Sequence, residues 1–471
     1  MSHRPDPARL RARRQLLGDS LDGAPILLVG HRPQPRNFLM NVHPFRQDST
    51  FLYFLGVDVP GAAAVIDGGR TTLYLPPAEP GDALWHGAAP GFAVWQARSG
   101  ADAVRPVGEL SSADRHTLPL AEPAANAEAA RLSGVPLDPS APTGSLRLRD
   151  AVIALRLCRD ADELAAMRRA TAVTADAHAA GMAATRPGAT EFDVQAAVEA
   201  VFTRAGMRPA YPSIVTVAGE VLHGHAVGTT MQDGDLLLLD AGAEEPGGYA
   251  SDVTRTWPVS GRFTPRQRAA YDAVLEANRV STDLVRAGVR YRDVHLASGR
   301  VIAAFARDEG LLVGDVDGLV ERGAHAVFFP HGVGHLLGLD VHDLELFGDA
   351  AGYAPGRSRS PQFGLSYLRL DRDLEPGMVV TVEPGFYVVP AILEDQALRD
   401  RLGDAVDWDR AASWIGFGGI RIEDDVVVTD GAPEILSEGI PRAADEVESA
   451  VGTEGPPRRT NAPAVGADRV R

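Results

Sequence analysis

Residues 234–259 read GDLLLLDAGAEEPGGYASDVTRTWPV, and this stretch decides the fold expected for the second half of the chain. Its four successive leucines fit a strand that is buried on both faces, and EEPGG is typical of a turn. With the turn centred on Pro246, Asp240 lies directly across from Asp252 on one face of a hairpin. We therefore predict a β-hairpin that carries two facing carboxylates.

These two carboxylates create an energetic problem. Facing residues of a hairpin have Cβ atoms about 4.5–5.5 Å apart, where like charges are destabilising. At an effective dielectric constant of about 20, the pair repels by roughly 3–4 kcal/mol. A divalent cation or a shared proton would offset that repulsion. A turn whose acids are simply solvated is the alternative that the hairpin alone leaves open.

A second segment, HAVFFPHGVGHLLGLDVHD at 325–343, concentrates histidines. It holds four of the 13 histidines of the chain, which are His325, His331, His335 and His342. His331 and His335 are four residues apart, but the glycines between them argue against a helical zinc site, which also needs a glutamate after the first histidine. These glycines instead indicate backbone that approaches a ligand or another strand closely. The density of imidazoles favours ligation or substrate contact over a purely structural role.

Two glutamates lie in runs of valine and isoleucine, MVVTVEPGFYV at 378–388 and GGIRIEDDVVVT at 418–429. Alternation predicts that Glu383 and Glu423 sit within strands, where an unpaired carboxylate would take up a proton. A salt bridge from Glu423 to an arginine is one solution. A metal shared with the aspartates and a histidine is the other, and it satisfies all of these groups together.

The candidate donor set has four carboxylates and one imidazole, a combination that suits Mn²⁺, Co²⁺ or Zn²⁺ rather than an ion selected by thiolates. Four carboxylates exceed the needs of one ion, so we predict two. Such a pair holds a hydroxide nucleophile and polarises a carbonyl group. The predicted ligands are Asp240, Asp252, His335, Glu383 and Glu423.

The rest of the chain fits two domains. Before about residue 150, helical spacing at 10–21 is followed by four strand-like runs, APILLVG, TFLYFLG, AAAVIDG and TTLYLP. The segment 122–145, rich in Ala, Pro, Gly and Ser, resembles the approach to a linker. Long helical patterns then cover 160–184 and 189–206. Residues 449–471 lack periodicity and are predicted to be a disordered tail.

Composition excludes several classes of function. The net charge of −17 argues against nucleic-acid binding. A single cysteine, Cys158, excludes a disulfide framework. No apolar run approaches the roughly 20 residues of a membrane span, and the charged N-terminal stretch does not resemble a signal peptide. We therefore expect a cytoplasmic protein without membrane or nucleic-acid partners.

From about Leu157 to Val447 the chain resembles the pita-bread metallopeptidases, in the proline-directed branch of aminopeptidase P and prolidase. The hairpin, the histidine segment and both glutamate segments carry this resemblance, and FRQDSTFLYFLG and ALWHGAAPG extend it toward the N-terminus. It implies an α+β architecture, with a C-terminal pita-bread metallopeptidase domain at 151–448. A smaller, aminopeptidase P-like α/β domain at 1–150 would precede it.

The resemblance also implies a role for each ligand. Asp240 would chelate one metal, while Asp252 and Glu423 would bridge both. His335 and Glu383 would complete the other site, and Glu383 would also act as general base toward a metal-bridging hydroxide. Manganese is the expected metal, with cobalt or zinc also compatible.

Further residues match positions around the substrate in this family. His342 and His223 match histidines that contact the substrate, and His331 and Arg421 resemble residues that hold the constellation in place. Trp85 lies in a segment that approaches a neighbouring subunit's active site in relatives, so we expect it to contact substrate in a homodimer or homotetramer.

The family contains two specificities, which differ in the end of the peptide that they recognise. Arg369, in SYLRLDRDLEPGM, resembles the prolidase residue that faces the carboxylate of a C-terminal proline, whereas FLYFLG fits bacterial aminopeptidase P. We predict an Xaa-Pro aminopeptidase, which releases the residue before a proline in the second position. An Xaa-Pro dipeptidase is the alternative. A non-catalytic pita-bread binding protein is a third, although such proteins lose the metal ligands.

Overall fold

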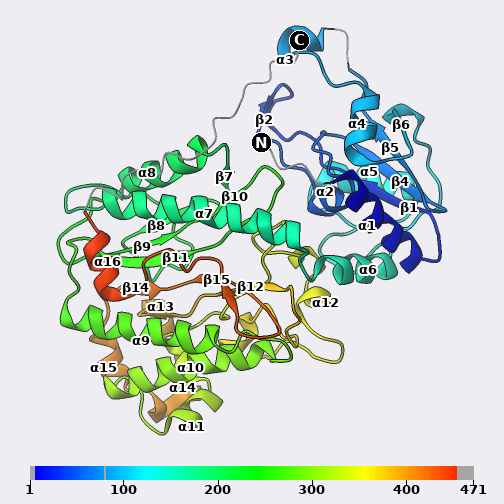
Figure 1. Ribbon diagram of the computed structural model, residues 1–471. Helices are drawn as coiled ribbons and strands as arrows, with labels where there is room; N and C mark the ends of the chain where they lie inside the picture. Colours follow the sequence, from blue (N-terminus) through cyan, green and yellow to red (C-terminus); the bar gives the residue numbers. More distant parts are fainter. Residues whose placement is uncertain (1–5, 79–80, 453–471) are drawn as a thin grey trace. The chain divides into compact units, whose positions relative to one another are not determined.

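The computed structural model describes residues 6–78 and 81–452, and the chain divides into two compact units (Figure 1). Among the described residues, the N-terminal unit comprises the chain from Asp6 to Cys158 together with Leu344–Ala351. The C-terminal unit comprises Arg159–Asp343 and the chain from Gly352 onward. The predicted boundary after residue 150 falls within helix α6 (Leu146–Arg156). Of the predicted tail, 453–471 lies outside the described residues, and helix α16 (Ala444–Ala450) covers its first two positions.

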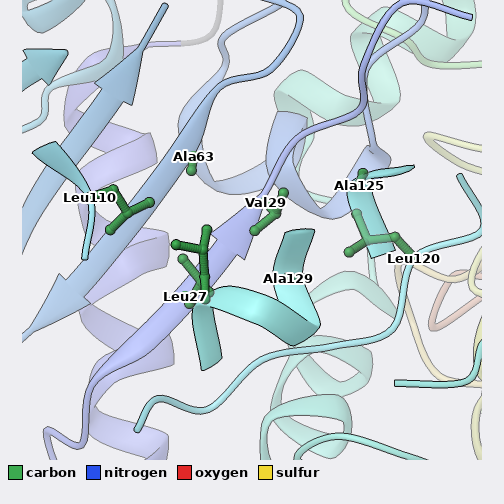
Figure 2. Packing of buried hydrophobic residues seen from close by; sticks show 8 residues of the cluster. Leu27, Val29, Ala63, Leu110, Leu120, Ala125 and Ala129 are labelled. Atoms are coloured by element: carbon green, nitrogen blue, oxygen red, sulfur yellow. The ribbon is translucent and has the colours of Figure 1, made fainter. Parts of the chain in front are cut away.

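A four-stranded sheet forms the centre of the N-terminal unit, in the order β1 (Ile26–Val29), β4 (Ala63–Asp67), β5 (Arg70–Leu75), β6 (Ala103–Pro106). The first three strands are antiparallel, and β5 and β6 are parallel. The other elements are the hairpin β2 (Pro35–Phe38) and β3 (Asn41–Val42), and helices α1 (Pro7–Ser20), α2 (Ser49–Leu55), α3 (Asp82–His86), α4 (Phe92–Ser99), α5 (Pro123–Ser133) and α6. Figure 2 shows Leu27 and Val29 of β1 beside Ala125 and Ala129 of α5 in the buried core.

Two sequence predictions in this unit are wrong. The run TFLYFLG is helix α2 rather than a strand, because the Asp48 side chain caps its start at the Phe51 amide (2.8 Å) and Gly56 ends it in the left-handed region at φ 61°. The presumed linker region contains helix α5, which begins at Pro123 with its first amides bonded to the Glu122 carboxylate. In both cases capping residues decide the structure of a short segment whose apolar pattern is ambiguous.

The C-terminal unit places short sheets between pairs of long helices. Its sheets have the orders β11-β9-β8, β12-β15-β16, β13-β14 and β10-β7. The strands are β7 (Arg208–Pro209), β8 (Ile214–Thr216), β9 (Leu236–Asp240), β10 (Ala243–Glu244), β11 (Thr254–Pro258), β12 (Val379–Val382), β13 (Gly385–Tyr387), β14 (Gly419–Arg421), β15 (Asp424–Val427) and β16 (Glu434–Ile435). In Figure 1 the pairs α7–α8 and α9–α10 lie on opposite sides of these strands.

The helices of this unit differ in how clearly the sequence marks their starts. They are α7 (Ala161–Ala184), α8 (Glu191–Arg204), α9 (Pro265–Thr282), α10 (Tyr291–Asp308), α11 (Val316–Glu321), α13 (Pro390–Leu393), α14 (Gln396–Leu402), α15 (Trp408–Ala412) and α16, and α12 (Asp349–Gly352) spans the junction with the N-terminal unit. Capping boxes at Asp160, Thr190 and Thr264 start α7, α8 and α9. The two long helices predicted at 160–184 and 189–206 are thus confirmed. Among the described residues, no helix is long and apolar enough to cross a membrane.

A buried ion pair fixes the chain beside Glu423. The Arg255 guanidinium donates to the Asp424 carboxylate at 2.8 Å and to the Glu423 carbonyl oxygen at 2.6 Å, and both ion-pair side chains are fully buried. Burial alone would raise the pKa of Asp424, but Arg255 and Arg442 lower it to about 2. Removing one partner of such a pair costs about 3–5 kcal/mol, because the other charge stays buried. The pair therefore holds one segment of the candidate site rigidly.

Candidate metal centre and active site

The hairpin supplies Asp240 and Asp252, but its register differs from the prediction. Asp240 pairs with Thr254, so the turn is centred on Gly247 and Asp252 lies two positions away from Asp240 along the partner strand. The prediction that the two acids face each other directly is therefore wrong. An even shift keeps them on the same face, as predicted. The partner of Asp252 is Gly242, where an added Cβ would lie 1.8 Å from a backbone oxygen, so only glycine fits there.

Tyr211 links the two aspartates. Its hydroxyl lies 2.6 Å from Asp240 Oδ1 and 2.5 Å from Asp252 Oδ1. A hydroxyl has one proton and donates to one carboxylate at a time, so the contact relieves only part of the repulsion. Burial, followed by the charges of both aspartates, raises the pKa of Tyr211 well above its usual value. Tyr211 is therefore a neutral donor.

His335 joins this pair from the histidine segment. Its Nε2 atom lies 3.4 Å from Asp252 Oδ2 and 3.9 Å from Glu383 Oε1. One ligand atom each of Asp252, His335 and Glu423 lie within 4.8 Å of one another, and all three residues are buried. Burial alone would lower the pKa of His335, but the hydrogen bond and charge of Asp252 raise it to about 9. In the absence of metal, a proton on His335 thus partly balances these carboxylates.

The two glutamates lie at breaks between strands, not within strands as predicted. Glu383 follows β12 and Glu423 lies between β14 and β15, because Pro384 interrupts the first ladder and the Glu423 amide bonds to Thr254 of β11 (3.0 Å). Burial, with repulsion from Asp252, raises the pKa of Glu383 to about 7. The same causes raise the pKa of Glu423 well above its usual value.

Arg421 connects this cluster from β14. Its Nη2 atom donates to Asp240 Oδ2 at 2.5 Å, and its Nε atom donates to Thr254 Oγ1 at 3.0 Å. The Thr254 hydroxyl donates in turn to Glu423 Oε2 at 2.7 Å. Arg421 thus pairs with Asp240 and reaches Glu423 only through the Thr254 hydroxyl.

His331 is held in one tautomer. Its Nδ1 atom lies 2.8 Å from the Gly332 carbonyl oxygen, so Nδ1 carries the proton, and Nε2 accepts from the Tyr387 hydroxyl at 2.9 Å. Tyr387 accepts from Arg421 Nη1 at 3.2 Å. Burial, followed by the charge of Arg421, lowers the pKa of His331 to about 3. His331 is therefore a neutral imidazole that the Arg421–Tyr387 chain orients.

His342, one of the predicted substrate-facing residues, lies directly beside this cluster. The His342 ring stacks on His335 with centroids 4.0 Å apart. The charges that His223 and Arg369 can carry contribute to lowering the pKa of His331, so both lie within electrostatic reach of it. Trp85 lies on α3 of the N-terminal unit with 73% of its surface exposed, and its substrate contact stays a prediction.

Sequence reasoning missed four residues of the site: Tyr211, Tyr387, Thr254 and Asp425. The Asp425 carboxylate accepts from the Asp252 amide at 3.2 Å. The signal available for Thr254 and Asp425 was alternation, which places them on the same strand faces as Asp252 and Glu423. Tyr387 lies in the same segment as Glu383, but nothing in the sequence marks its hydroxyl as part of the site, and Tyr211 comes from a segment outside those that carry the ligands.

The donor set fits divalent cations. Asp240, Asp252, Glu383 and Glu423 are carboxylates whose charges repel one another in a desolvated cluster, and His335 adds an imidazole within reach of two of them. Oxygen-rich sites with an imidazole suit hard or borderline divalent ions. A cation would lower the raised pKa values of Asp240, Glu383 and Glu423 and release the proton from His335.

Two family models match the chain. Residues 165–430 match "Metallopeptidase family M24", and residues 10–122 match "Aminopeptidase P, N-terminal domain". The two matches fall on the C-terminal and N-terminal units respectively.

Curated relatives and solved structures are similar over nearly the whole chain. An Xaa-Pro aminopeptidase of Escherichia coli is 32% identical over 93% of this chain and 96% of its own, and the human Xaa-Pro dipeptidase is 33% identical over 86% and 84%. The structure of Pseudomonas aeruginosa aminopeptidase PepP has a TM-score of 0.76 at 32% identity, covering 95% of this chain and 98% of that one. Aminopeptidase P from Escherichia coli with the inhibitor Pro-Leu has a TM-score of 0.77 at 31% identity, with the same coverage.

The site predicts metal-dependent stability that requires Asp252. A ligand that binds only the folded state at 100 times its Kd adds about 2.7 kcal/mol to the free energy of unfolding. We expect Mn²⁺ to raise the melting temperature of the metal-free wild type, and Asp252→Asn to abolish that rise while leaving a cooperative transition. Asp272→Asn, an exposed change on α9, is the control and should respond like the wild type. An undiminished Mn²⁺ response in Asp252→Asn would remove Asp252 from the metal site.

Proposed function

The chain belongs to metallopeptidase family M24 and carries an aminopeptidase P N-terminal domain, and from this premise we propose that it is an Xaa-Pro aminopeptidase. It would hydrolyse the bond between the first residue of a peptide and a proline in the second position. The observation that carries the proposal is the buried donor set, in which Asp252, His335 and Glu423 present ligand atoms within 4.8 Å of one another. The Xaa-Pro aminopeptidase of Escherichia coli, matched over 93% of this chain, supports the substrate class.

Five residues would hold two metal ions, for which we propose manganese. Asp240 would bind one ion, His335 and Glu383 the other, and Asp252 and Glu423 both. When bound, such a pair supplies an activated water molecule and polarises the carbonyl group of the scissile bond.

The protein's own groups have distinct proposed roles in hydrolysis. Glu383 is the candidate general base: its side chain is 19% exposed, against 7% for Asp252 and 4% for His335, so it is the ligand most open to solvent among these three. His342, stacked on His335, and His223 would contact the peptide beside the scissile bond. His331 and Arg421 would hold their neighbours in position, since both belong to the hydrogen-bonded chain through Tyr387.

A dipeptidase is the second candidate, and Arg369 is the observation that favours it. A dipeptidase must bind the carboxylate of a C-terminal proline, and Arg369 lies within electrostatic reach of His331. The similarity to the human Xaa-Pro dipeptidase has the same level of identity as that to the bacterial aminopeptidase. The two activities therefore need a direct comparison of substrates.

We also propose that the chain assembles into a homodimer or homotetramer in the cytoplasm, with Trp85 near a neighbouring active site. The exposed side chains of Leu84 and Trp85 on α3 support an interface there. Light scattering at micromolar concentration should give a mass of two or four chains. A monomer would contradict the assembly.

Hydrolysis of Ala-Pro and Ala-Pro-Ala by the Mn²⁺-loaded protein tests the specificity. We expect Ala-Pro-Ala to be cut at least as well as Ala-Pro, and Arg369→Ala to change the kcat/KM for Ala-Pro-Ala little. Arg286→Ala, which removes an exposed arginine, is the matched control. The aminopeptidase assignment fails if only Ala-Pro is cut. Arg369→Ala should then cost roughly 10- to 100-fold in kcat/KM, since hydrogen bonds to charged groups contribute about 1.5–3 kcal/mol.

A further inference from the structure

The loop that carries His223 has little regular structure of its own. Residues 217–229 connect β8 to the segment before β9 and contain no helix or strand. His223 lies near the middle of this loop and is exposed. Its position therefore depends on what fixes the two ends of the loop.

A buried carboxylate joins those ends. Glu191, the first residue of α8, is 1% exposed. Its Oε1 atom accepts from the Val217 amide at 3.1 Å, and its Oε2 atom accepts from the amides of Val227 at 3.0 Å and Thr229 at 3.1 Å. One side chain thus binds the first residue of the loop and two residues at its end.

Neighbouring contacts align the second end of the loop with the start of α8. The Glu191 amide donates to the Thr229 carbonyl oxygen at 3.1 Å, and the Met231 amide donates to the Ala189 carbonyl oxygen at 2.9 Å. Gly228, at φ 81°, lies so close to the Phe192 ring that an added Cβ would be 2.6 Å from a ring carbon. The first end of the loop, at Val217, reaches the start of α8 by a different contact, its hydrogen bond to the Glu191 side chain.

The same loop touches the strand that carries Arg421. An added Cβ at Gly219 would lie 2.6 Å from the carbonyl oxygen of Gly419, the first residue of β14, so the two backbones are in close contact. The loop that Glu191 closes is therefore part of the wall of the candidate active site.

We propose that Glu191 is a positioning residue for peptide hydrolysis, because its buried carboxylate closes the base of the loop 217–229 and thereby holds His223 at the substrate. The predicted effect on hydrolysis rests on the proposed function. The clamp, by which we mean the hydrogen bonds from Val217, Val227 and Thr229 to the Glu191 carboxylate, does not depend on that function. The three loop amides all donate hydrogen bonds, so they need acceptor atoms only. The two carboxylate oxygens of Glu191 provide these acceptors. A glutamine would turn an NH₂ group toward at least one of these amides.

A double-mutant cycle tests this role with the Mn²⁺-loaded full chain and Ala-Pro-Ala or Ala-Pro, whichever the wild type cleaves. Small displacements of positioned groups can cost about 100-fold in rate. We expect Glu191→Gln to lower kcat/KM about 10- to 100-fold at an unchanged metal content. In a His223→Ala background the same change should cost less than about twofold, because the group through which Glu191 acts is already absent. Equal losses in both backgrounds, or no loss in the wild type, would overturn the proposal.

Two controls separate the clamp from general effects on α8. Glu199→Gln makes the same chemical change on the same helix, where the carboxylate accepts from the Gln195 side chain, and should leave kcat/KM within about twofold. Asp193→Asn weakens the capping box at the start of α8 without touching the loop amides. Its effect on kcat/KM should be the same in the wild type and in the His223→Ala background.

Amide hydrogen exchange provides a readout that does not need peptide hydrolysis. Glu191→Gln should speed exchange at Val217, Val227 and Thr229 relative to the amides within α8, while Glu199→Gln should not. If the wild type cleaves neither peptide, the proposed function fails while faster exchange at the three amides still supports the clamp. Unchanged exchange at those amides would overturn the clamp whatever the activity.

Discussion

Asp240, Asp252, Glu383 and Glu423 are crowded into one desolvated cluster, and the repulsion among their charges is the constraint on which the rest of the C-terminal unit depends. At an effective dielectric constant of about 20, each close pair of carboxylates repels by roughly 3–4 kcal/mol. Two cationic groups offset part of this negative charge: the guanidinium of Arg421 and the protonated imidazole of His335. Against four ionised carboxylates these leave two negative charges, and in the absence of metal the raised pKa values of Glu383 and Glu423 favour protons there. One or more divalent cations, as proposed above, would replace these protons and balance the charge.

The architecture serves that constraint by bringing short segments from distant parts of the chain to one place. The hairpin of β9 and β11 provides both aspartates, and the breaks after β12 and between β14 and β15 turn the glutamates toward them. Glycine at position 242 permits the close approach beside Asp252. The buried Arg255, paired with Asp424, also donates to the Glu423 carbonyl oxygen. These contacts hold the backbone of the Glu423 segment in place, so the carboxylates cannot easily move apart. The charged side chains of the cluster are therefore held at fixed positions, as a catalytic site requires.

The candidate ligands could be predicted from acids and histidines within apolar or glycine-rich runs, and the fold class from the resemblance to a known family. The long helices at 160–184 and 189–206 followed from their helical spacing, and the β9 strand from its leucines. The turn residues alone did not give the register of the hairpin, and the residues before the turn, Ala243 and Glu244, also pair with β7, a tertiary contact that the hairpin sequence does not reveal. TFLYFLG was assigned to a strand from its apolar residues alone, whereas Asp48 before the run and Gly56 at its end cap a helix. Tyr211, Tyr387 and Glu191 act through tertiary contacts with segments far away in the sequence, for which periodicity offers no signal.

The number of metal ions per chain tests the central claim most directly. Protein stripped of metal, reloaded with Mn²⁺ and freed of excess ions should bind close to two ions per chain by elemental analysis. The second ion is expected because four carboxylates exceed the coordination needs of a single cation. A fully active protein that holds one ion or none would contradict the account, since the charges of Asp240, Asp252, Glu383 and Glu423 would then be balanced in some other way.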